Sequence, residues 1–212
     1  YKKKNSILIY NGIDTKVFKK ISSNSLREKL GINKSTYLFG LIARDDPIKG
    51  HEDFLKAIAL VSNSHGILVG DGITSSERIL NEIGKLNISH KISLFEQNDK
   101  IQNIISSLDL LVSASYSEGF PSVIAEAMSC ETSVIATNVG DSSEIMGKLG
   151  TIIQPGDYIS LSNKIKIYIR SAKTEREKIG KELRERIKTN FSSEVMHIKY
   201  NKIYNTLCGK NN

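Results

Sequence analysis

The sequence predicts an α/β fold in which helices cover both faces of a doubly wound, Rossmann-like parallel sheet. Short apolar runs alternate with amphipathic segments along most of the chain, which is the pattern of repeated strand–helix units. Several of the apolar runs are nearly continuous, as in strands whose two faces are both covered. No two-residue hairpin turn separates them. We therefore expect one parallel sheet, followed by extra helices near the C-terminus.

The predicted strands are short segments rich in Ile, Leu, Val and Phe. Three of them end in clear turn signals, at Asn11-Gly12, at Gly70 and at Pro155-Gly156. In chain order the predicted strands are 6–10, 37–43, 66–69, 91–95, 108–112, 133–137 and 150–154.

The predicted helices lie between these strands and beyond the last one. Phe54, Ile58 and Val61 recur at helical spacing and mark one buried stripe. Near the C-terminus, Glu177–Lys181 and Glu182–Arg186 stand four residues apart, which favours an exposed helix. The predicted helices are 25–30, one that includes 54–61, 75–86, 99–108, 121–128, a short one that the turn 139–144 leads into, a helical region after 155–157 that includes 174–189, and a last one from Ser192 or Ser193.

Bulk composition excludes several classes of protein. The 212 residues suit one domain, and no run approaches the ~18 apolar residues of a membrane span. Cys130 and Cys208 form no C-x-x-C motif, so neither a zinc site nor a dithiol site is indicated, and a reducing cytoplasm is expected. The start, Tyr1-Lys2-Lys3-Lys4, has no initiator Met, so we expect the chain to be part of a longer protein.

The net charge of +7 is unevenly distributed along the chain. Residues 1–163 contain 17 basic and 18 acidic side chains, whereas residues 164–212 contain 13 and 5. A solvated helical face explains this excess, and attraction to an anionic membrane is the functional alternative. No recognition motif accompanies the charge, so nucleic acid is not expected as a partner.

The stretch that says most about function follows the predicted strand 108–112. Glu118 stands in a glycine-containing loop, Pro121 suits the first turn of a helix, and Glu126 comes between one and two turns later. A helix N-terminus can hold a phosphate, and the two carboxylates could reach the ends of an elongated ligand with an anionic centre. A nucleotide-sugar has this layout. The alternative is that Glu118 caps the helix and Glu126 is solvated.

Two cations accompany an earlier strand–helix junction in the chain. Arg44 stands at the carboxyl end of a predicted strand, where open α/β sheets bind ligands, and Lys49 precedes a helix. Together they could neutralise a diphosphate, or they could be surface cations that pair with Asp45 and Asp46. The two adjacent aspartates do not form a separated Asp-x-Asp, so no metal-bridged nucleotide is expected.

Residues 118–126, Glu-Gly-Phe-Pro-Ser-Val-Ile-Ala-Glu, resemble the glutamate-x7-glutamate signature of retaining glycosyltransferases of family four, which have the GT-B fold. The resemblance extends over most of the chain. It includes the segments 10–14 with Phe18, 44–51, 134–144 and 191 onward. It implies that residues 1–212 are the C-terminal, donor-binding half of a GT-B enzyme, and that an N-terminal acceptor domain is missing.

The resemblance also implies roles for individual residues. Arg44 and Lys49 would bind the diphosphate and stabilise the charge on the leaving nucleotide. Glu118 would orient the donor sugar and offset oxocarbenium charge, and Glu126 would bind the ribose hydroxyls. The remaining donor-binding residues would come from the signature loop and helix, a glycine-rich loop and a segment near the base: Gly119, Phe120, Pro121, Ser122 and Val123; Gly70 and Asp71; and Gln97 with its neighbours Glu96 and Asn98.

The implied reaction is transfer of a sugar from a nucleotide-sugar with retention, without a metal or other cofactor, in bacterial polysaccharide or lipopolysaccharide synthesis. The expected location is the cytoplasm, with peripheral contact at the inner face of the cell membrane. Without its acceptor domain, the chain should bind nucleotide but not transfer sugar. Two alternatives stay open: a nucleotide-sugar epimerase of GT-B-like fold, and a non-catalytic module that binds nucleotide or membrane.

Overall fold

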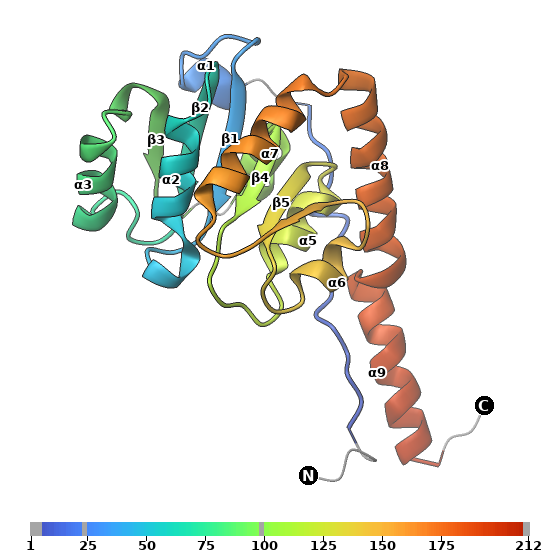
Figure 1. Ribbon diagram of the computed structural model, residues 1–212. Coiled ribbons are helices and arrows are strands. Elements are labelled where there is room, and N and C mark those ends of the chain that lie inside the picture. Colours follow the sequence, from blue (N-terminus) through green and yellow to red (C-terminus); the bar gives the residue numbers. More distant parts are fainter. Residues whose placement is uncertain (1–5, 23–24, 98–99, 210–212) are drawn as a thin grey trace.

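The computed structural model of the chain describes residues 6–22, 25–97 and 100–209. In these residues, parallel strands form a six-stranded sheet in the order β3-β2-β1-β4-β5-β6, with helices on both faces (Figure 1). The predicted fold class is confirmed. The strands are β1 Tyr37–Ile42, β2 Ser64–Val69, β3 Ile92–Phe95, β4 Leu110–Ser113, β5 Ser133–Thr137 and β6 Thr151–Ile153.

The helices follow the predicted alternation closely. Several begin at residues whose side chains accept hydrogen bonds from the first turn: Ser76 from Ile79 N, and Ser192 from Val195 N. The predicted helix 99–108 begins at Ile101, because Lys100 is its N-cap residue and has non-helical dihedral angles. Asp99 lies outside the described residues. The helices are α1 Ser25–Lys29, α2 His51–Ala59, α3 Glu77–Lys85, α4 Ile101–Ser107, α5 Ser122–Ser129, α6 Ser142–Met146, α7 Tyr158–Arg170, α8 Lys173–Asn190 and α9 Ser193–Leu207, with short 3-10 turns η2 Pro47–Lys49 and η3 Ser89–Lys91.

The sheet separates two apolar layers, as expected of nearly continuous apolar strands. Along β1, Leu38 packs into one layer with residues of α4, α5 and α8, whereas Phe39 and Leu41 pack into the other with α2, α3 and α7. Successive residues of a strand point to opposite faces, so this one strand supplies both layers. Burial on both faces explains why the strand contains so few polar residues.

The strand order reverses direction at β1, and this fixes the position of the site. The chain leaves β1 through α2 to form β2 on one side, and later returns to form β4 on the other side. In open α/β sheets, ligands bind in the crevice at the carboxyl ends of the strands where the order reverses. A ligand site is therefore expected where β1 and β4 end.

The predicted strand 6–10 is wrong. This segment forms no ladder with the sheet, and the side chains of Ile7 and Leu8 are 69% and 70% exposed. Near it, Ile13 forms an isolated bridge with Ser192, at the start of α9. The apolar run instead lies beside α9, which projects from the domain and buries none of its own residues (Figure 1).

The predicted ion pairs on α8 are also wrong. The structure pairs Glu177 with Lys173 at 3.7 Å and Glu182 with Lys178 at 4.0 Å. Arg186 turns toward α6 instead, and its Nε donates a hydrogen bond to the carbonyl of Ile145 at 2.7 Å. One face of this helix is buried against the core, which directs Arg186 away from Glu182.

No helix in the described ranges combines the length and the apolar character needed to cross a bilayer. Of the two cysteines, Cys130 is fully buried at the end of α5 and Cys208 is exposed, and both are free thiols.

Candidate active site

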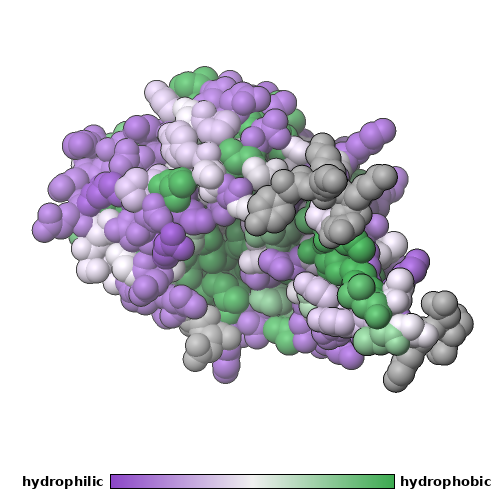
Figure 2. Space-filling model, turned by 90° about the horizontal axis from the view of Figure 1, so that it is seen from below, coloured by the Kyte–Doolittle hydropathy of each residue, from purple (hydrophilic) through white to green (hydrophobic). Residues whose placement is uncertain are grey.

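A cavity of about 370 Å³ lies at the switch point of the sheet. The ends of β1 and β4 form its floor, and the loop before α5 and the first turn of α5 form one wall. Figure 2 looks onto this end of the molecule and shows hydrophobic residues gathered in a central hollow with hydrophilic residues around it. The cavity is lined by Leu41, Ile42, Ala43, Arg44, Lys49, Gln97, Val112, Ser113, Ser115, Glu118, Phe120, Pro121, Ser122 and Val123.

Most of the residues singled out in the sequence meet in this cavity, although they come from separate segments. They share a position at or just after the carboxyl end of a strand, which is why the topology brings them together. The predicted residues in the lining are Arg44, Lys49, Gln97, Glu118, Phe120, Pro121, Ser122 and Val123.

Lys49 and Glu118 form an ion pair inside the cavity. Lys49 Nζ lies 2.8 Å from Glu118 Oε1, and the two side chains are only 18% and 15% exposed. Ser115 Oγ also donates a hydrogen bond to Glu118 Oε1 at 2.7 Å. One carboxylate oxygen therefore accepts two hydrogen bonds, so Glu118 is held in place by the strand–loop junction and by the opposite loop.

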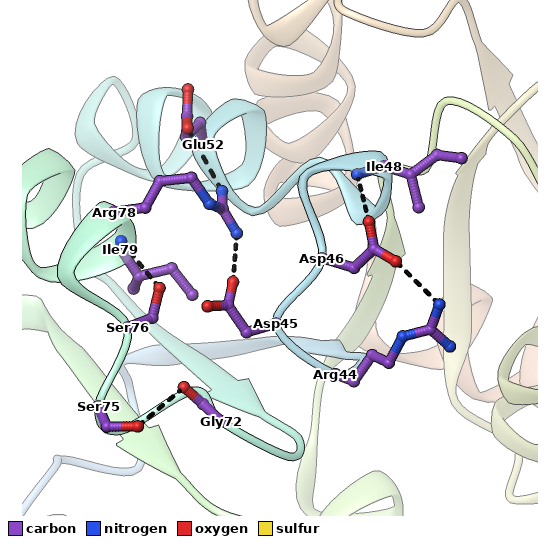
Figure 3. Close-up of polar contacts among 10 residues, drawn as sticks. All are labelled: Arg44, Asp45, Asp46, Ile48, Glu52, Gly72, Ser75, Ser76, Arg78 and Ile79. Atoms are coloured by element: carbon purple, nitrogen blue, oxygen red, sulfur yellow. Dashed lines mark hydrogen bonds and ion pairs between the residues drawn. The ribbon is translucent and has the colours of Figure 1, made fainter.

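Arg44 is arranged differently from Lys49. Its side chain is 65% exposed and pairs with Asp46 through Nη2 and Oδ2 at 2.8 Å (Figure 3). Asp46 also caps η2, since its Oδ1 accepts a hydrogen bond from Ile48 N at 3.1 Å. The structure thus realises part of the surface-pairing alternative for Arg44, with Asp46 as the partner, while Arg44 still lines the cavity.

The turn after η2 depends on glycine. Gly50 has φ +69°, and a Cβ built on it would lie 2.1 Å from the carbonyl oxygen of Ala114. Ala114 follows β4 directly, so the close approach joins the Lys49 loop to the loop that contains Glu118. Tyr116 N also donates to Ile48 O at 2.7 Å, which connects the same two loops.

Further contacts fix the signature loop from outside the cavity. Tyr116 Oη donates a hydrogen bond to Asp53 Oδ2 of α2 at 2.6 Å. This bond to the carboxylate, together with burial, raises the pKa of the Tyr116 hydroxyl to about 12. On the other side, Asp141 N donates to Gly119 O at 2.9 Å. Gly119 is exposed and does not line the cavity, so its contact here is structural.

Pro121 is the N-cap residue of α5, one position before the predicted first turn. Ser122 and Val123 are the first helical residues, and both line the cavity. The first amides of a helix have no acceptor within the helix, and they carry the positive end of its dipole. This edge of the cavity can therefore receive an anion.

Glu126 lies outside the cavity lining, further along α5, and is half-buried. Burial raises the pKa of its carboxyl, and a hydrogen bond with Ser122 only partly offsets this. A desolvated carboxyl of this kind favours hydrogen-bonding partners, and its contact with ribose hydroxyls stays a prediction.

The glycine-rich loop also lies outside the lining. Gly70 packs against β1 so closely that a Cβ would lie 1.9 Å from Ala43 O. The exposed Asp71 accepts a hydrogen bond from Asp45 N through its carbonyl at 2.8 Å. Glu96 accepts hydrogen bonds from Gly72 N at 3.0 Å and from Thr74 N at 2.9 Å.

In the segment 96–98, which was predicted to lie near the base, the described residues Glu96 and Gln97 have different surroundings. Glu96 stabilises the neighbouring loop, while Gln97 lines the cavity. Asn98 lies outside the described residues.

A larger cavity, about 580 Å³, lies at the opposite end of the sheet and contains none of the predicted site residues. Its lining contains six basic and three acidic side chains, and two of the cations are paired: Arg27 with Asp109 at 2.5 Å and Lys173 with Glu177 at 3.7 Å. The switch-point cavity is smaller but combines the strand ends, a helix N-terminus and the predicted cations. Among the described residues, no group of three or more His, Cys, Asp or Glu is arranged to hold a metal ion.

Sequence reasoning missed several residues that organise the site. Ser115 precedes the signature residues 118–126, and a serine three residues before a loop carboxylate is a local signal for a side-chain hydrogen bond. Asp53 gave no such signal, because its partner Tyr116 is 63 residues away. Arg78, which contacts Asp45, belongs to a different helix and was not singled out.

Comparisons with known proteins agree with this geometry. A sequence model of the family described as "Glycosyl transferases group 1" matches residues 22–186. The chain is 27% identical over 201 residues to N-acetyl-alpha-D-glucosaminyl L-malate synthase of Bacillus anthracis, covering 92% of this chain and 52% of that protein. It is 26% identical over 203 residues to the capsular polysaccharide biosynthesis glycosyltransferase CapM of Staphylococcus aureus, covering 92% of this chain and 53% of that one.

A solved structure shows the same architecture. The Anabaena protein HepE in complex with UDP and glucose superposes with a TM-score of 0.86 at 25% identity, over 94% of this chain and 57% of HepE. The doubly wound sheet matches the architecture of GT-B glycosyltransferase structures, as predicted. The chain thus spans about half the length of the relatives it matches.

Proposed function

This chain belongs to the group 1 glycosyl transferases, and from that premise we propose that it is the domain of a glycosyltransferase that binds a nucleotide-sugar donor. The observation that supports this most strongly is the switch-point cavity, in which Arg44, Lys49 and the start of α5 border one space with Glu118. Two cations and a helix N-terminus form a binding site for a diphosphate. HepE was solved in complex with UDP and glucose, which are the two parts of such a donor.

Donor binding has to rearrange the ion pair seen in the cavity. Lys49 is neutralised by Glu118, so a diphosphate that contacts Lys49 Nζ competes with that carboxylate. A diphosphate carries more charge than one carboxylate and also reaches the amides of α5, so it is the stronger competitor. Glu118 keeps its hydrogen bond from Ser115 and becomes available to the hydroxyls of the donor sugar.

In the proposed reaction the bond between the anomeric carbon and the diphosphate breaks, and its electron pair goes to the diphosphate. Arg44 and Lys49 stabilise the negative charge that develops there. Glu118 orients the sugar and offsets positive charge on the ring, and Glu126 accepts hydrogen bonds from the ribose. The oxygen of the acceptor hydroxyl forms the new bond to the anomeric carbon with retention, as in family four, and its proton passes to the departing diphosphate. No metal is required, because the two cations and the helix supply the positive charge.

We place this chain as the C-terminal half of its enzyme, with an acceptor-binding domain in the rest. An apolar groove of about 380 Å³ lies between residues 7–9 and α9, where Ile7, Leu8 and Leu207 are 69%, 70% and 77% exposed. Figure 2 shows hydrophobic residues gathered on this part of the surface as well. Contiguous exposed apolar surface marks an interface, and the other half of the enzyme is the occupant we propose.

The proposed pathway is polysaccharide or lipopolysaccharide assembly in the bacterial cytoplasm. CapM, by its name, acts in capsular polysaccharide biosynthesis. Peripheral contact with an anionic membrane is part of the proposal and rests on the basic excess of residues 164–212. Sedimentation with anionic and neutral vesicles tests it. The variant is charge reversal at Lys164 and Arg170, two exposed cations of α7 that lie outside the apolar groove. Equal sedimentation with both vesicle types would remove the membrane from the proposal.

Calorimetric titration of the chain with UDP, GDP and ADP tests the donor-binding function. We expect one of the three to bind, and Lys49→Ala to weaken that binding at least about tenfold, since a charged hydrogen bond to phosphate is lost. A folded chain that binds none of them would contradict the proposal.

A further inference from the structure

Arg78 of α3 forms a second ionic contact with the loop that contains both predicted phosphate-binding cations. Its Nη2 pairs with Asp45 Oδ1, and its Nη1 lies 3.3 Å from Glu52 Oε1 of α2 (Figure 3). Arg78 and Asp45 are each 27% exposed, so the pair is partly shielded from water. Arg78 does not line the switch-point cavity.

The loop 44–49 contains charges of both signs, and the contact between Arg78 and Asp45 neutralises one of its anions. Residues 44–49 contain two cations, Arg44 and Lys49, and two anions, Asp45 and Asp46. A diphosphate is attracted by the cations and repelled by the anions, and the four charges lie within six residues. For the loop to favour a diphosphate, the anions must be neutralised or turned away.

The side chains of Asp45 and Asp46 point in different directions and have different partners. Asp46 turns toward Arg44 and caps η2, whereas Asp45 turns the other way, toward Arg78 (Figure 3). The backbone fixes this arrangement, because Asp45 N donates to Asp71 O at 2.8 Å and so ties the loop to the end of β2. Burial raises the pKa of Asp45, but hydrogen bonds with Ser76 and Arg78 outweigh it and hold that pKa below its usual value. Asp45 is therefore a full negative charge that needs a partner.

We propose that Arg78 is a positioning residue for donor binding, which neutralises Asp45 and holds it away from Arg44 and Lys49. The proposal rests on the proposed function of the switch-point cavity. Without Arg78, the Asp45 carboxylate is uncompensated and can swing to Arg44, its neighbour in the chain. Both effects lower the positive potential that meets the diphosphate.

A double-mutant cycle with Arg78→Met and Asp45→Asn tests this role, using the nucleoside diphosphate that wild type binds best. We expect Arg78→Met to weaken binding about fivefold, because one charge near the diphosphate is left uncompensated in a partly solvated site. Asp45→Asn should bind within about twofold of wild type, and so should the double variant, because removing Asp45 removes the need for Arg78. Arg78→Lys, which keeps the charge, should bind nearly as well as wild type.

A merely structural role would not give this pattern. If Arg78 only supported the fold, the double variant would bind as weakly as Arg78→Met, and that result would overturn the proposal. Wild-type binding by Arg78→Met would overturn it too. The matched control is Lys188→Met, which removes an exposed cation paired with Glu185 at 3.0 Å on α8 and should change nothing. Thermal melts of every variant report folding independently.

Ionic strength adds a second readout. The Arg78→Met deficit should shrink as salt is raised from about 0.05 to 0.5 M, since screening weakens the repulsion by Asp45. Failure of the proposed function is distinguishable from failure of this inference. In the first case wild type binds no nucleotide or Lys49→Ala binds normally, whereas in the second those results hold and only the cycle fails.

Discussion

Lys49 Nζ and Glu118 Oε1 lie 2.8 Å apart in the switch-point cavity, which both residues line, and both side chains are mostly buried. These residues are 69 positions apart in the chain and belong to two different strand–helix junctions. The pair therefore has two roles in our account. The pair joins the two loops while the cavity is free of donor. When the donor binds, Lys49 exchanges its contact with Glu118 for one with phosphate.

The two roles can be separated by mutation. Lys49→Met should lower the free energy of unfolding by about 3 kcal/mol, because it leaves the Glu118 carboxylate buried without its cation. The double variant Lys49→Met/Glu118→Gln should recover most of that stability, since no uncompensated charge remains. It should not recover nucleotide affinity, which requires the cation. Urea unfolding and calorimetry measure the two quantities, and joint recovery of both would mean that Lys49 does not bind phosphate.

The turn at Gly50 should tolerate no side chain. Gly50→Ala places a Cβ about 2.1 Å from Ala114 O at a φ of +69°, so we expect a loss of about 3 kcal/mol or more in the free energy of unfolding. The matched control is Gly84→Ala in α3, where a Cβ meets nothing within 4 Å. That substitution should stabilise by about 0.5–1 kcal/mol through helix propensity. Similar urea midpoints for the two variants would show that the close approach at Gly50 is not rigid.

Two buried histidines should make stability depend on pH near neutrality. Burial lowers the pKa of both His51 and His65, with smaller contributions from nearby Arg78 for His51 and Lys91 for His65. In the unfolded chain these groups titrate near ~6.5, so below that pH the unfolded state binds more protons than the folded state. The contribution of the two histidines to the free energy of unfolding is present above pH ~6.5, and it is lost as the pH falls toward their folded pKa values.

The expected size is about 0.8 kcal/mol per histidine between pH 7.5 and 6, provided the folded forms stay neutral. Urea unfolding at these two pH values measures it. His65→Asn should roughly halve the loss, and Ser93, whose Oγ lies 2.9 Å from His65 Nε2, can still hydrogen-bond to the new side chain. The aspartates with lowered pKa, such as Asp45 and Asp46, lose their contributions only at more acidic pH. Equal stability at pH 7.5 and 6 would contradict the prediction.

Metal removal should leave the reaction intact. In our account Arg44, Lys49 and the start of α5 supply the positive charge at the diphosphate. Transfer by the whole enzyme should therefore continue at the same rate after dialysis against EDTA. Product analysis in the same assay separates transfer from epimerisation of the nucleotide-sugar. A rate that collapses on chelation and returns with Mg²⁺ or Mn²⁺ would show that the cations do not suffice.

The fold could be predicted from the sequence because its central strands are apolar on both faces. Segment 133–137 matches β5 residue for residue, and the sequence of strand–helix alternation left few other topologies. The run 6–10 misled because it is equally apolar. Unlike the strands of the sheet, this run has no neighbouring strand to pair with. The local sequence pattern does not show whether such a partner exists.

The site was predictable in part because the position of its residues follows from the parallel sheet. Arg44, Lys49 and Glu118 each follow a strand, and a parallel sheet brings such residues to one edge. Contacts between side chains that are far apart in the sequence were not predictable. Arg78 with Asp45, Tyr116 with Asp53, and Arg186 with the carbonyl of Ile145 connect elements whose orientation only the packed structure defines.

The central claim is that a diphosphate binds between Lys49 and the N-terminus of α5. The most direct test is a crystal structure of this chain with the nucleoside diphosphate that binds most tightly. We predict phosphate oxygens within hydrogen-bonding distance of Lys49 Nζ and of the Ser122 or Val123 amide, with the Lys49–Glu118 contact lengthened or broken. Nucleotide bound elsewhere, or bound while Lys49 and Glu118 remain 2.8 Å apart with no phosphate contact, would contradict the account.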